Sequence, residues 1–309
     1  MTADSSQSPG HSSGGAPVAL DPRRHPFRED LAAEELRGRV AAPRYASGVR
    51  RQVRLGVADL KTAPGARAPL ASQVLFGELF MVYAVAEGWA WGQCAHDGYV
   101  GYLRETALTP ESGPAPAPVT HRVAVLRTFL FSAPSIKAPV ETALSLATPL
   151  RGAVADGLFL RLAGGGWVFA AHCAPVGCGD PDPATTAARF LGLPYLWGGR
   201  SSLGIDCSGL AQIALAWAGI AAPRDSDMQC AEVGRRIAEA AAPATGFQRG
   251  DLVFFPGHVG IMADAHTLTH ATAFTLSVIN EPVAAVAERA GGIVAVQRLE
   301  RGKSPDGRG

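Results

Sequence analysis

Short runs in which apolar and polar residues alternate dominate the first half of the chain. Between Val53 and Leu108, glycine and aspartate interrupt these runs at close intervals, as in VRLGVADL and DGYVGYLRETAL. A period of two predicts β-strands, because successive side chains of a strand point to opposite faces of the sheet. Short strands with turn residues between them are typical of a small barrel, which we expect over residues 53–108.

The same pattern returns after a segment rich in proline. Residues 109–120 contain four prolines and predict a semi-rigid linker. Residues 121–174 then alternate again, and the Gly-Trp dipeptide at 88–89 recurs at 166–167. This repetition indicates a weak internal duplication, with two small barrels in tandem. Residues 175–184 predict a second linker.

The two ends of the chain differ from this centre. Residues 1–20 are rich in serine and glycine and predict a disordered tail. Residues 21–52 form a separate N-terminal segment, in which DLAAEELRGR at 30–39 predicts a short helix with Asp30 as its N-cap. We expect residues 301–309 to form a flexible tail.

Residues 185–300 follow a different plan, with helical patterns first and strand patterns afterwards. Apolar residues at helical spacing predict helices over 185–193, 207–220 and 227–240. Four strand-like runs come next: DLVFF, HVGIMA, TLTHATA and VAVQRLE. Helices followed by antiparallel strands are typical of an α+β domain in which the helices pack on the sheet.

The composition of the chain limits the classes of binding partner and the cellular compartment that we expect. Hydrophobic residues make up 47% of the chain, the net charge is +1, and lysine and arginine form no dense run. These values argue against nucleic acid or a membrane as a partner and favour a small soluble substrate. The first residues lack the features of a signal peptide, and no apolar run approaches the ~18 residues of a membrane helix. We therefore expect a cytoplasmic protein and, by default, a monomer.

One of the five cysteines stands where a thiol is chemically useful. Cys207, in DCSGL, follows a glycine-rich loop and opens an amphipathic helix. Backbone N–H groups and the helix dipole at such a start lower the pKa of a thiol and favour the nucleophilic thiolate. Packing is the commoner role of a cysteine at a helix start, so this position alone does not identify an enzyme. A free, often buried thiol is the default for the other four cysteines.

A nucleophilic cysteine needs a base, and the base needs a group that orients it. His258 opens HVGIMA, and His270 lies 12 positions later (270 − 258) in TLTH, a separation that suits neighbouring antiparallel strands. One ring could then fix the tautomer of the other. Burial within the sheet is the alternative for both. His266 lies in a turn, and its spacing from His270 would suit zinc only on a helix, so we expect no metal site.

Five motifs in one order carry a resemblance to a known family. They are PYLWGG at 194–199, DCSGL at 206–210, RGDLVFF at 249–255, HVGIMA at 258–263 and LTHA at 268–271. Over residues 185–300 the chain resembles the NlpC/p60 family of papain-like cell-wall peptidases.

The resemblance implies a role for four of the residues. It gives Cys207 as the nucleophile, His258 as the base and His270 as the residue that orients the base, with no cofactor. It also implies that Tyr195 assists the oxyanion site, where the backbone N–H of Cys207 would be a second donor.

The upstream regions resemble bacterial SH3-like domains. This arrangement implies a γ-D-glutamyl-L-diamino-acid endopeptidase, like dipeptidyl-peptidase VI, that acts on murein peptides with a free N-terminal L-alanine. A carboxylate and a tyrosine of the first barrel would then hold the ammonium group, and Glu78 and Tyr99 fit these roles. A solvated turn charge at Glu78 and a core aromatic at Tyr99 are the alternatives.

Further substrate contacts are implied on the peptidase domain, at Asp206, Ser208, Asp225 and Ser226. Asp225 and Ser226 also suit the N-cap of the helix that follows them. We also expect Trp197 to pack beneath the loop that precedes Cys207.

The predicted fold class is α+β, with a papain-like NlpC-type catalytic domain preceded by two small SH3-like β-barrels. The predicted function is hydrolysis of the γ-D-glutamyl amide of murein peptides, in the recycling of cell-wall fragments. Two alternatives stay open. One is amidase or acyl-transfer chemistry on another amide, and the other is a wall-peptide-binding protein without activity.

Overall fold

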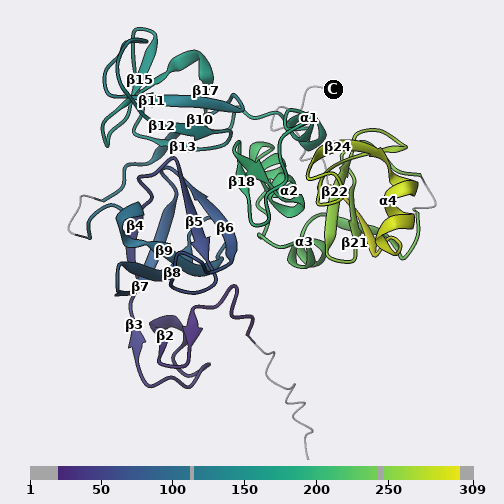
Figure 1. Cartoon of the computed structure of the whole chain (residues 1–309), viewed down its shortest axis with the longest axis horizontal. Coiled ribbons are helices and arrows are strands. Elements are labelled where there is room, and N and C mark those ends of the chain that lie inside the picture. The colour runs from purple at the N-terminus through teal and green to yellow at the C-terminus, as the bar shows by residue number, and fades with distance from the viewer. Residues whose placement is uncertain (1–19, 112–114, 243–245, 300–309) are drawn as a thin grey trace, which may run out of the picture.

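A small sheet begins the computed structural model, which describes residues 20–111, 115–242 and 246–299 (Figure 1). Its strands are β1 (Phe27–Arg28), β2 (Leu31–Ala33) and β3 (Tyr45–Ala46), in the order β1-β2-β3. The predicted helix over residues 30–39 is therefore wrong. Only Glu34–Leu36 form a 3₁₀ turn, η1, because the three residues of β2 are buried in the sheet and packing outweighs helix propensity. The predicted tails lie outside the described residues, apart from Leu20.

The strands predicted between residues 53 and 108 are present, and together with β4, which precedes them, they form one six-stranded antiparallel sheet in the order β4-β7-β8-β9-β5-β6. The strands of this sheet are β4 (Val49–Gln52), β5 (Val57–Lys61), β6 (Leu70–Leu75), β7 (Leu79–Ala86), β8 (Trp89–Cys94) and β9 (Val100–Arg104), followed by the 3₁₀ turn η2 (Glu105–Ala107). Leu60, Phe80 and Leu103 lie in its buried core.

The second β-rich region contains a three-stranded sheet, β13-β10-β17, and a five-stranded sheet, β12-β11-β16-β15-β14. Its strands are β10 (Val119–Val123), β11 (Arg127–Phe131), β12 (Val140–Ser145), β13 (Pro149–Arg151), β14 (Val154–Asp156), β15 (Phe159–Arg161), β16 (Trp167–Phe169) and β17 (Cys173–Pro175), with the 3₁₀ turn η3 (Ala170–His172) before β17.

A constant offset relates the two β-rich regions. β11 begins 70 positions after β5 (127 − 57), and β12 begins 70 positions after β6 (140 − 70). This offset supports the predicted duplication. The two closed barrels are not seen among the described residues. No strand pairing joins the edges β4 and β6, and the second region is divided between two sheets. The edge strand β6 instead packs against β18 of the C-terminal domain.

The C-terminal domain has the predicted α+β plan. Its elements are α1 (Pro183–Ala188), β18 (Arg200–Ser201), β19 (Gly204–Ile205), α2 (Cys207–Trp217), α3 (Ser226–Glu232), β20 (Arg235–Glu239), β21 (Leu252–Phe255), β22 (His258–Met262), β23 (Thr267–Thr272), β24 (Ser277–Pro282), α4 (Val283–Ala290) and β25 (Ala295–Arg298). The sheet order is β20-β25-β21-β22-β23-β24, and α2 packs against β22 and β23. None of the described helices is long and apolar enough to cross a membrane.

Three parts of this domain differ from prediction. The helix expected over residues 185–193 is shorter, because α1 ends at Ala188. The helix expected over residues 227–240 ends at Glu232, because Gly234 adopts a left-handed φ of 74° and the chain continues as β20, which pairs with β25. The strand β24 and the helix α4 were not predicted, although β24 pairs with the predicted histidine strand β23 and α4 packs against β24.

Three parts of the chain share one hydrophobic core. Leu75 of the first β-rich region and Leu146 of the second pack in the same cluster as Leu210 of α2 and Ile261 of β22. Met228 of α3 enters the core of the six-stranded sheet. Figure 1 shows β18 and α2 between that sheet and the strands β21 to β24. The start of α2 therefore lies close to the junction of the domains.

Candidate active site

A loop and one carboxylate position the start of α2. Asp206 is the N-cap of α2, and its Oδ1 accepts the N–H of Gly209 at 2.7 Å. Its Oδ2 accepts the N–H of Gly198 at 2.8 Å and a hydrogen bond from Arg224 at 2.7 Å. Because the cap, the loop and the guanidinium together fix Asp206, the helix begins at Cys207, as predicted.

The glycine of DCSGL is required by a close approach of the backbone. A β-carbon at position 209 would lie 2.3 Å from the carbonyl oxygen of Gly199, far inside van der Waals contact. Only glycine lets the glycine-rich loop pass this close to the first turn of α2.

The two predicted substrate contacts beside Cys207 have partners within the protein. Arg224 donates to Ser208 Oγ at 2.8 Å and to the two oxygens of Asp206 at 3.0 and 2.7 Å. Arg224 is only 1% exposed, so this ion pair is buried. These contacts give both residues a part in holding the loop, and their contact with a substrate stays a prediction.

The thiol of Cys207 is buried, with 9% of the residue exposed. Burial raises its pKa to about 11, and the charge of Asp206 acts in the same direction. Hydrogen bonds from the N–H groups of Val259 and Ser208 and the charge of Arg224 oppose this shift only in part. The lowered pKa that the helix start predicted is therefore wrong, because desolvation outweighs the backbone dipoles. The resting side chain is a thiol that needs a base.

His258 and His270 meet as their spacing predicted. β22 and β23 are adjacent antiparallel strands, and His258 Nε2 lies 2.7 Å from His270 Nδ1. Burial lowers the pKa of His258 to about 4, with contributions from His270 and from the Arg289 charge. Burial also lowers the pKa of His270, which is fully buried, although Glu281 opposes the shift. Both imidazoles are therefore neutral at pH 7.

Cys207 comes to the histidine pair through the packing of α2 on β22. The N–H of Val259, the residue after His258, reaches the thiol. Because His258 uses Nε2 toward His270, its Nδ1 is the nitrogen available to the thiol. The structure thus brings the three predicted catalytic residues to one place.

Two further residues extend the histidine pair. His270 Nε2 lies 2.9 Å from Glu281 Oε2, and Arg289 of α4 donates to the two oxygens of Glu281 at 3.1 and 2.6 Å. The Arg289 guanidinium holds the pKa of Glu281 below its usual range, and His270 acts in the same direction. Sequence reasoning missed both residues because it placed no strand or helix there. The β-branched pair Val278-Ile279, just before Glu281, was the available signal.

Tyr195 lies on the loop side of the same site. It packs against the core cluster that contains Cys207, and its backbone pairs with Ile205. Burial raises the pKa of the Tyr195 hydroxyl, and the nearby acidic groups Cys207 and Asp206 act in the same direction. The hydroxyl is therefore protonated at pH 7 and available as a hydrogen-bond donor.

Tyr99 and Asp225 meet across the domain junction. Tyr99 Oη donates to Asp225 Oδ2 at 2.9 Å, and Arg23 Nη1 donates to the same oxygen at 2.9 Å. The ring of Tyr99 packs in the core of the six-stranded sheet, while its hydroxyl contacts Asp225. Tyr99 is therefore a core aromatic residue whose polar end lies at the domain junction. Asp225 stands at the N-cap position of α3 without a side-chain capping bond, and the half-buried Ser226 follows it.

Glu78 is buried rather than a solvated turn charge. Arg200 donates to its two oxygens at 2.9 and 2.8 Å, and the N–H of Leu75 donates at 2.8 Å. Burial opposes ionisation of Glu78, but the charges of Arg200 and His96 outweigh it and keep its pKa below the usual range. Because Glu78 already has a cationic partner, its predicted contact with a substrate ammonium stays a prediction that this geometry does not favour.

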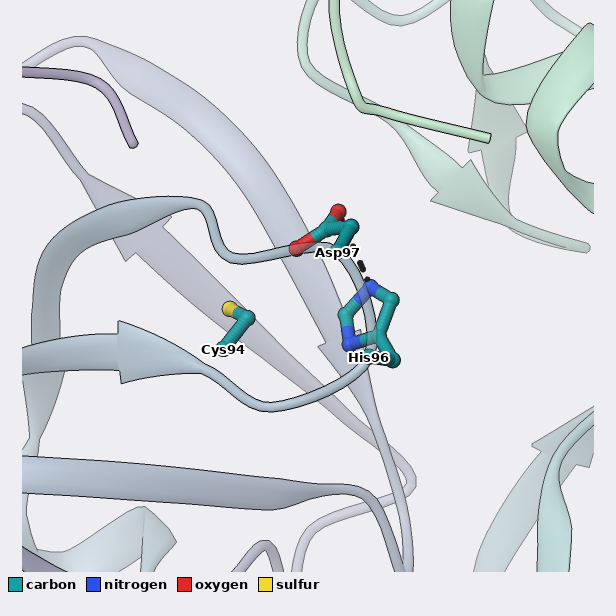
Figure 2. Close-up of side chains that lie close together, drawn as sticks. All are labelled: Cys94, His96 and Asp97. Carbon is teal, nitrogen blue, oxygen red and sulfur yellow. Dashed lines mark ion pairs between the residues drawn. The ribbon is translucent and has the colours of Figure 1, made fainter. Parts of the chain in front are cut away.

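Within the described residues, one group of side chains has closely spaced donor atoms for a metal ion: Cys94, His96 and Asp97 (Figure 2). Their donor atoms lie within 4.8 Å of one another. However, His96 Nε2 is 3.0 Å from Asp97 Oδ2, and Gln212 of α2 donates to the same oxygen at 2.9 Å. Burial also raises the pKa of the Cys94 thiol far above its ordinary value, which disfavours a thiolate ligand. The group fits a hydrogen-bonded contact between the domains better than a metal centre.

Trp197 is exposed instead of packing beneath the loop, with 71% of the residue accessible. A β-carbon at Gly198 would lie 2.8 Å from Leu70, and one at Gly199 would lie 2.6 Å from the carbonyl oxygen of Gly204. The loop packs too closely against these neighbours to cover an indole ring.

Two regions of the chain match families of known proteins. Residues 192–288 match the NlpC/P60 family, and residues 60–108 match the bacterial dipeptidyl-peptidase Sh3 domain.

Individual relatives agree with these matches. The gamma-D-glutamyl-L-lysine dipeptidyl-peptidase of Bacillus subtilis (strain 168) is 29% identical over 225 residues, which cover 65% of this chain and 72% of that protein. Dipeptidyl-peptidase 6 of Lysinibacillus sphaericus is 40% identical over 87 residues, so the match spans 28% of this chain and only 30% of that relative. The structure of an NlpC/P60 family protein from Bacillus cereus ATCC 10987 aligns with a TM-score of 0.69 at 21% identity, covering 81% of this chain and 99% of that chain. It therefore shares the fold.

A thiol at a helix start beside a histidine pair on an antiparallel sheet is the arrangement expected of a cysteine peptidase. The matched domain and the shared fold make the assignment specific. Residues 192–288 therefore match an NlpC/P60 domain, and the chain is a hydrolase of the cysteine-peptidase class.

Proposed function

We propose that this peptidase hydrolyses the γ-D-glutamyl–L-diamino acid bond of murein peptides whose N-terminal L-alanine is free. The observation that carries the proposal is the hydrogen bond of 2.9 Å between Tyr99 of the six-stranded sheet and Asp225 of the peptidase domain. The relative from B. subtilis is a gamma-D-glutamyl-L-lysine dipeptidyl-peptidase, which supports the same bond class.

Asp225 has the properties of an ammonium-binding carboxylate. Its side chain is 25% exposed, so a ligand can reach it. Burial raises the pKa of Asp225, because the carboxylate is poorly solvated. A partly desolvated carboxylate is stabilised by a cation, and Arg23 fills this place in the free protein. The Tyr99 hydroxyl orients the carboxylate toward the same place. We therefore assign the amine contact to Asp225 and Tyr99, with Ser226 beside them.

The chemistry follows from the neutral thiol and the neutral imidazole. The Cys207 proton passes to His258 Nδ1 as the sulfur attacks the γ-glutamyl carbonyl, and a C–S bond forms. His258 then gives this proton to the departing amine, the C–N bond breaks, and a thioester remains. Water, deprotonated by His258, attacks the thioester and restores the thiol.

The oxyanion that develops in both steps needs donors that are already in place. We assign the backbone N–H of Cys207, at the first position of α2, and the protonated hydroxyl of Tyr195 to this role. Asp206 and Ser208 hold the loop that carries both donors, through Arg224.

The proposal is tested with the tripeptide L-Ala-γ-D-Glu-diamino acid, with its N-terminus either free or acetylated. The wild type is expected to release L-Ala-D-Glu from the free peptide, and Cys207→Ala is expected to have no activity above background. Asp225→Asn should raise KM for the free peptide and reduce the preference over the acetylated one. If Cys207→Ala cleaves at the wild-type rate, the proposal is wrong. Transfer of the acyl group to an added amine, in preference to water, would indicate an acyltransferase.

We further propose that the substrates are short turnover fragments handled in the cytoplasm. An alanine joined to the glycan strand carries no ammonium group, so a carboxylate site for a free amine favours released peptides. Cell fractionation that finds most of the protein outside the cytoplasm contradicts this part.

A further inference from the structure

We propose that Glu281 is a positioning residue that fixes the tautomers of both site histidines. This inference rests on the proposed roles of Cys207, His258 and His270. It adds a fourth and a fifth residue to the arrangement, because Arg289 in turn fixes Glu281.

The direction of each hydrogen bond in the series His258–His270–Glu281 follows from its final acceptor, the Glu281 carboxylate. An ionised carboxylate has no proton to donate, so the contact of 2.9 Å requires the proton of His270 to be on Nε2. A neutral imidazole has one N–H, so His270 Nδ1 is then an acceptor. The contact of 2.7 Å therefore requires His258 to donate from Nε2. His258 Nδ1 is left with a free lone pair.

This tautomer is the one that the reaction needs. A lone pair on His258 Nδ1 can take the Cys207 proton, whereas the opposite tautomer would present an N–H to the thiol and could not act as a base. Without an obligate acceptor at position 281, His270 could carry its proton on either nitrogen. The pair would then divide between a competent and an incompetent arrangement.

The surroundings keep Glu281 ionised and in place. Its side chain is 17% exposed, and Arg289 contacts both of its oxygens from α4. The Arg289 guanidinium also lies 4.2 Å from the centroid of the Phe274 ring. The main influence on the pKa of Glu281 is the hydrogen bond from Arg289, which lowers it, so the carboxylate is charged at neutral pH. The register places Glu281 on β24 diagonal to His270, which pairs with Ile279, so both side chains lie on one face.

A purely structural role is the alternative, in which Glu281 only ties α4 to the sheet through Arg289. The two roles are separated by comparing Glu281→Ala with Arg289→Leu. Both variants remove the ion pair, but only Glu281→Ala removes the acceptor of His270. Glu239→Gln is the matched control, because Glu239 forms an exposed pair with Arg236 at 3.3 Å on the far edge strand β20.

The decisive measurement is the tautomeric state of the histidines, read from two-bond ¹H–¹⁵N correlation spectra of the full chain labelled at histidine, at pH 7. Single variants His258→Ala and His270→Ala assign the two rings. We expect both rings to be protonated at Nε2 in the wild type, in Arg289→Leu and in Glu239→Gln. Glu281→Ala should give mixed tautomers, with kcat for the tripeptide reduced roughly 10-fold or more and KM little changed. Glu281→Gln, whose amide oxygen can accept but whose NH₂ can also donate, should be intermediate.

Unchanged tautomers and a kcat within about two-fold of wild type in both Glu281→Ala and Glu281→Gln would overturn the inference. If Glu281→Ala does not fold, the Gln variant and the wild-type spectrum still decide it, because a wild-type His258 protonated at Nδ1 would contradict it directly. The tautomer spectra need no substrate. A wild type that shows the expected tautomers but does not cleave the tripeptide would refute the proposed substrate and leave the role of Glu281 standing.

Discussion

Arg200 and Glu78 form a fully buried ion pair across the junction between the peptidase domain and the six-stranded sheet, with N–O distances of 2.9 and 2.8 Å. Their residues are 3% and 8% exposed. The backbone N–H of Arg200 also donates to Gln73 of β6 at 3.0 Å. This pair holds the glycine-rich loop against β6, so the first β-rich region shapes the site that lies on the other domain.

Breaking this pair should be costly. Arg200→Met leaves the Glu78 carboxylate buried without its cation, and we expect a loss of about 3–5 kcal/mol in the free energy of unfolding by urea. The double variant Glu78→Gln/Arg200→Met should recover part of it. Arg236→Met, which breaks an exposed pair, is the control and should change stability by less than about 1 kcal/mol. A stable Glu78→Gln variant with a raised KM only for the free-amine peptide would instead assign Glu78 to the substrate.

Arg23 occupies the carboxylate that we assign to the substrate ammonium. Arg23→Ala removes this competitor, so KM for the free tripeptide should fall, by up to about 5-fold for an exposed pair, with kcat unchanged. Steady-state kinetics on free and acetylated peptides measure the effect, and Arg24→Ala, whose partner is Glu232, is the control. A rise in KM would mean that Arg23 helps to build the amine site.

The buried histidines predict a loss of stability in acid. The folded pKa of His258 is lowered from 6.5 to about 4, and that of His270 is also lowered. Both imidazoles bind protons more readily in the unfolded chain. Their contribution to the free energy of unfolding is therefore complete above the pKa of the unfolded state, and it is lost as the pH falls through the pKa of the folded state. For His258 this amounts to roughly 3 kcal/mol. Urea midpoints measured between pH 7.5 and pH 4 should fall in the wild type and fall less in His258→Gln. Equal slopes for the two proteins would contradict the assignment.

The buried thiol predicts slow alkylation at neutral pH. Because burial raises the pKa of Cys207 to about 11, its reaction with iodoacetamide should keep accelerating well into the alkaline range. Site-resolved mass spectrometry compares it with the exposed Cys178 in the same sample. A rate for Cys207 that already reaches a plateau below pH 7 would show a stable thiolate and refute the neutral resting pair.

Much of the secondary structure could be predicted, because the sequence patterns that indicate it are local. Alternation in residues 53–108 and 121–174 marked strands, and the Gly-Trp repeat marked a duplication that the offset of 70 between β5 and β11 supports. The failures came where distant partners override local preference. DLAAEELRGR has helical composition, yet β2 forms because neighbouring strands bury it. The segment after α3 reads as helix, yet it pairs with β25.

The sequence by itself determined the candidate catalytic residues and their order along the chain. They are a cysteine at a capped helix start and two histidines at a spacing that suits adjacent strands. Those features depend on short segments, so composition and spacing suffice to predict them. Only the tertiary structure decided the protonation of the thiol, the partner of Glu78 and the extension of the histidine pair to Glu281 and Arg289. Each of these depends on burial or on a charge that the fold brings across tens of residues, and desolvation and Coulomb interactions are set by distance in space.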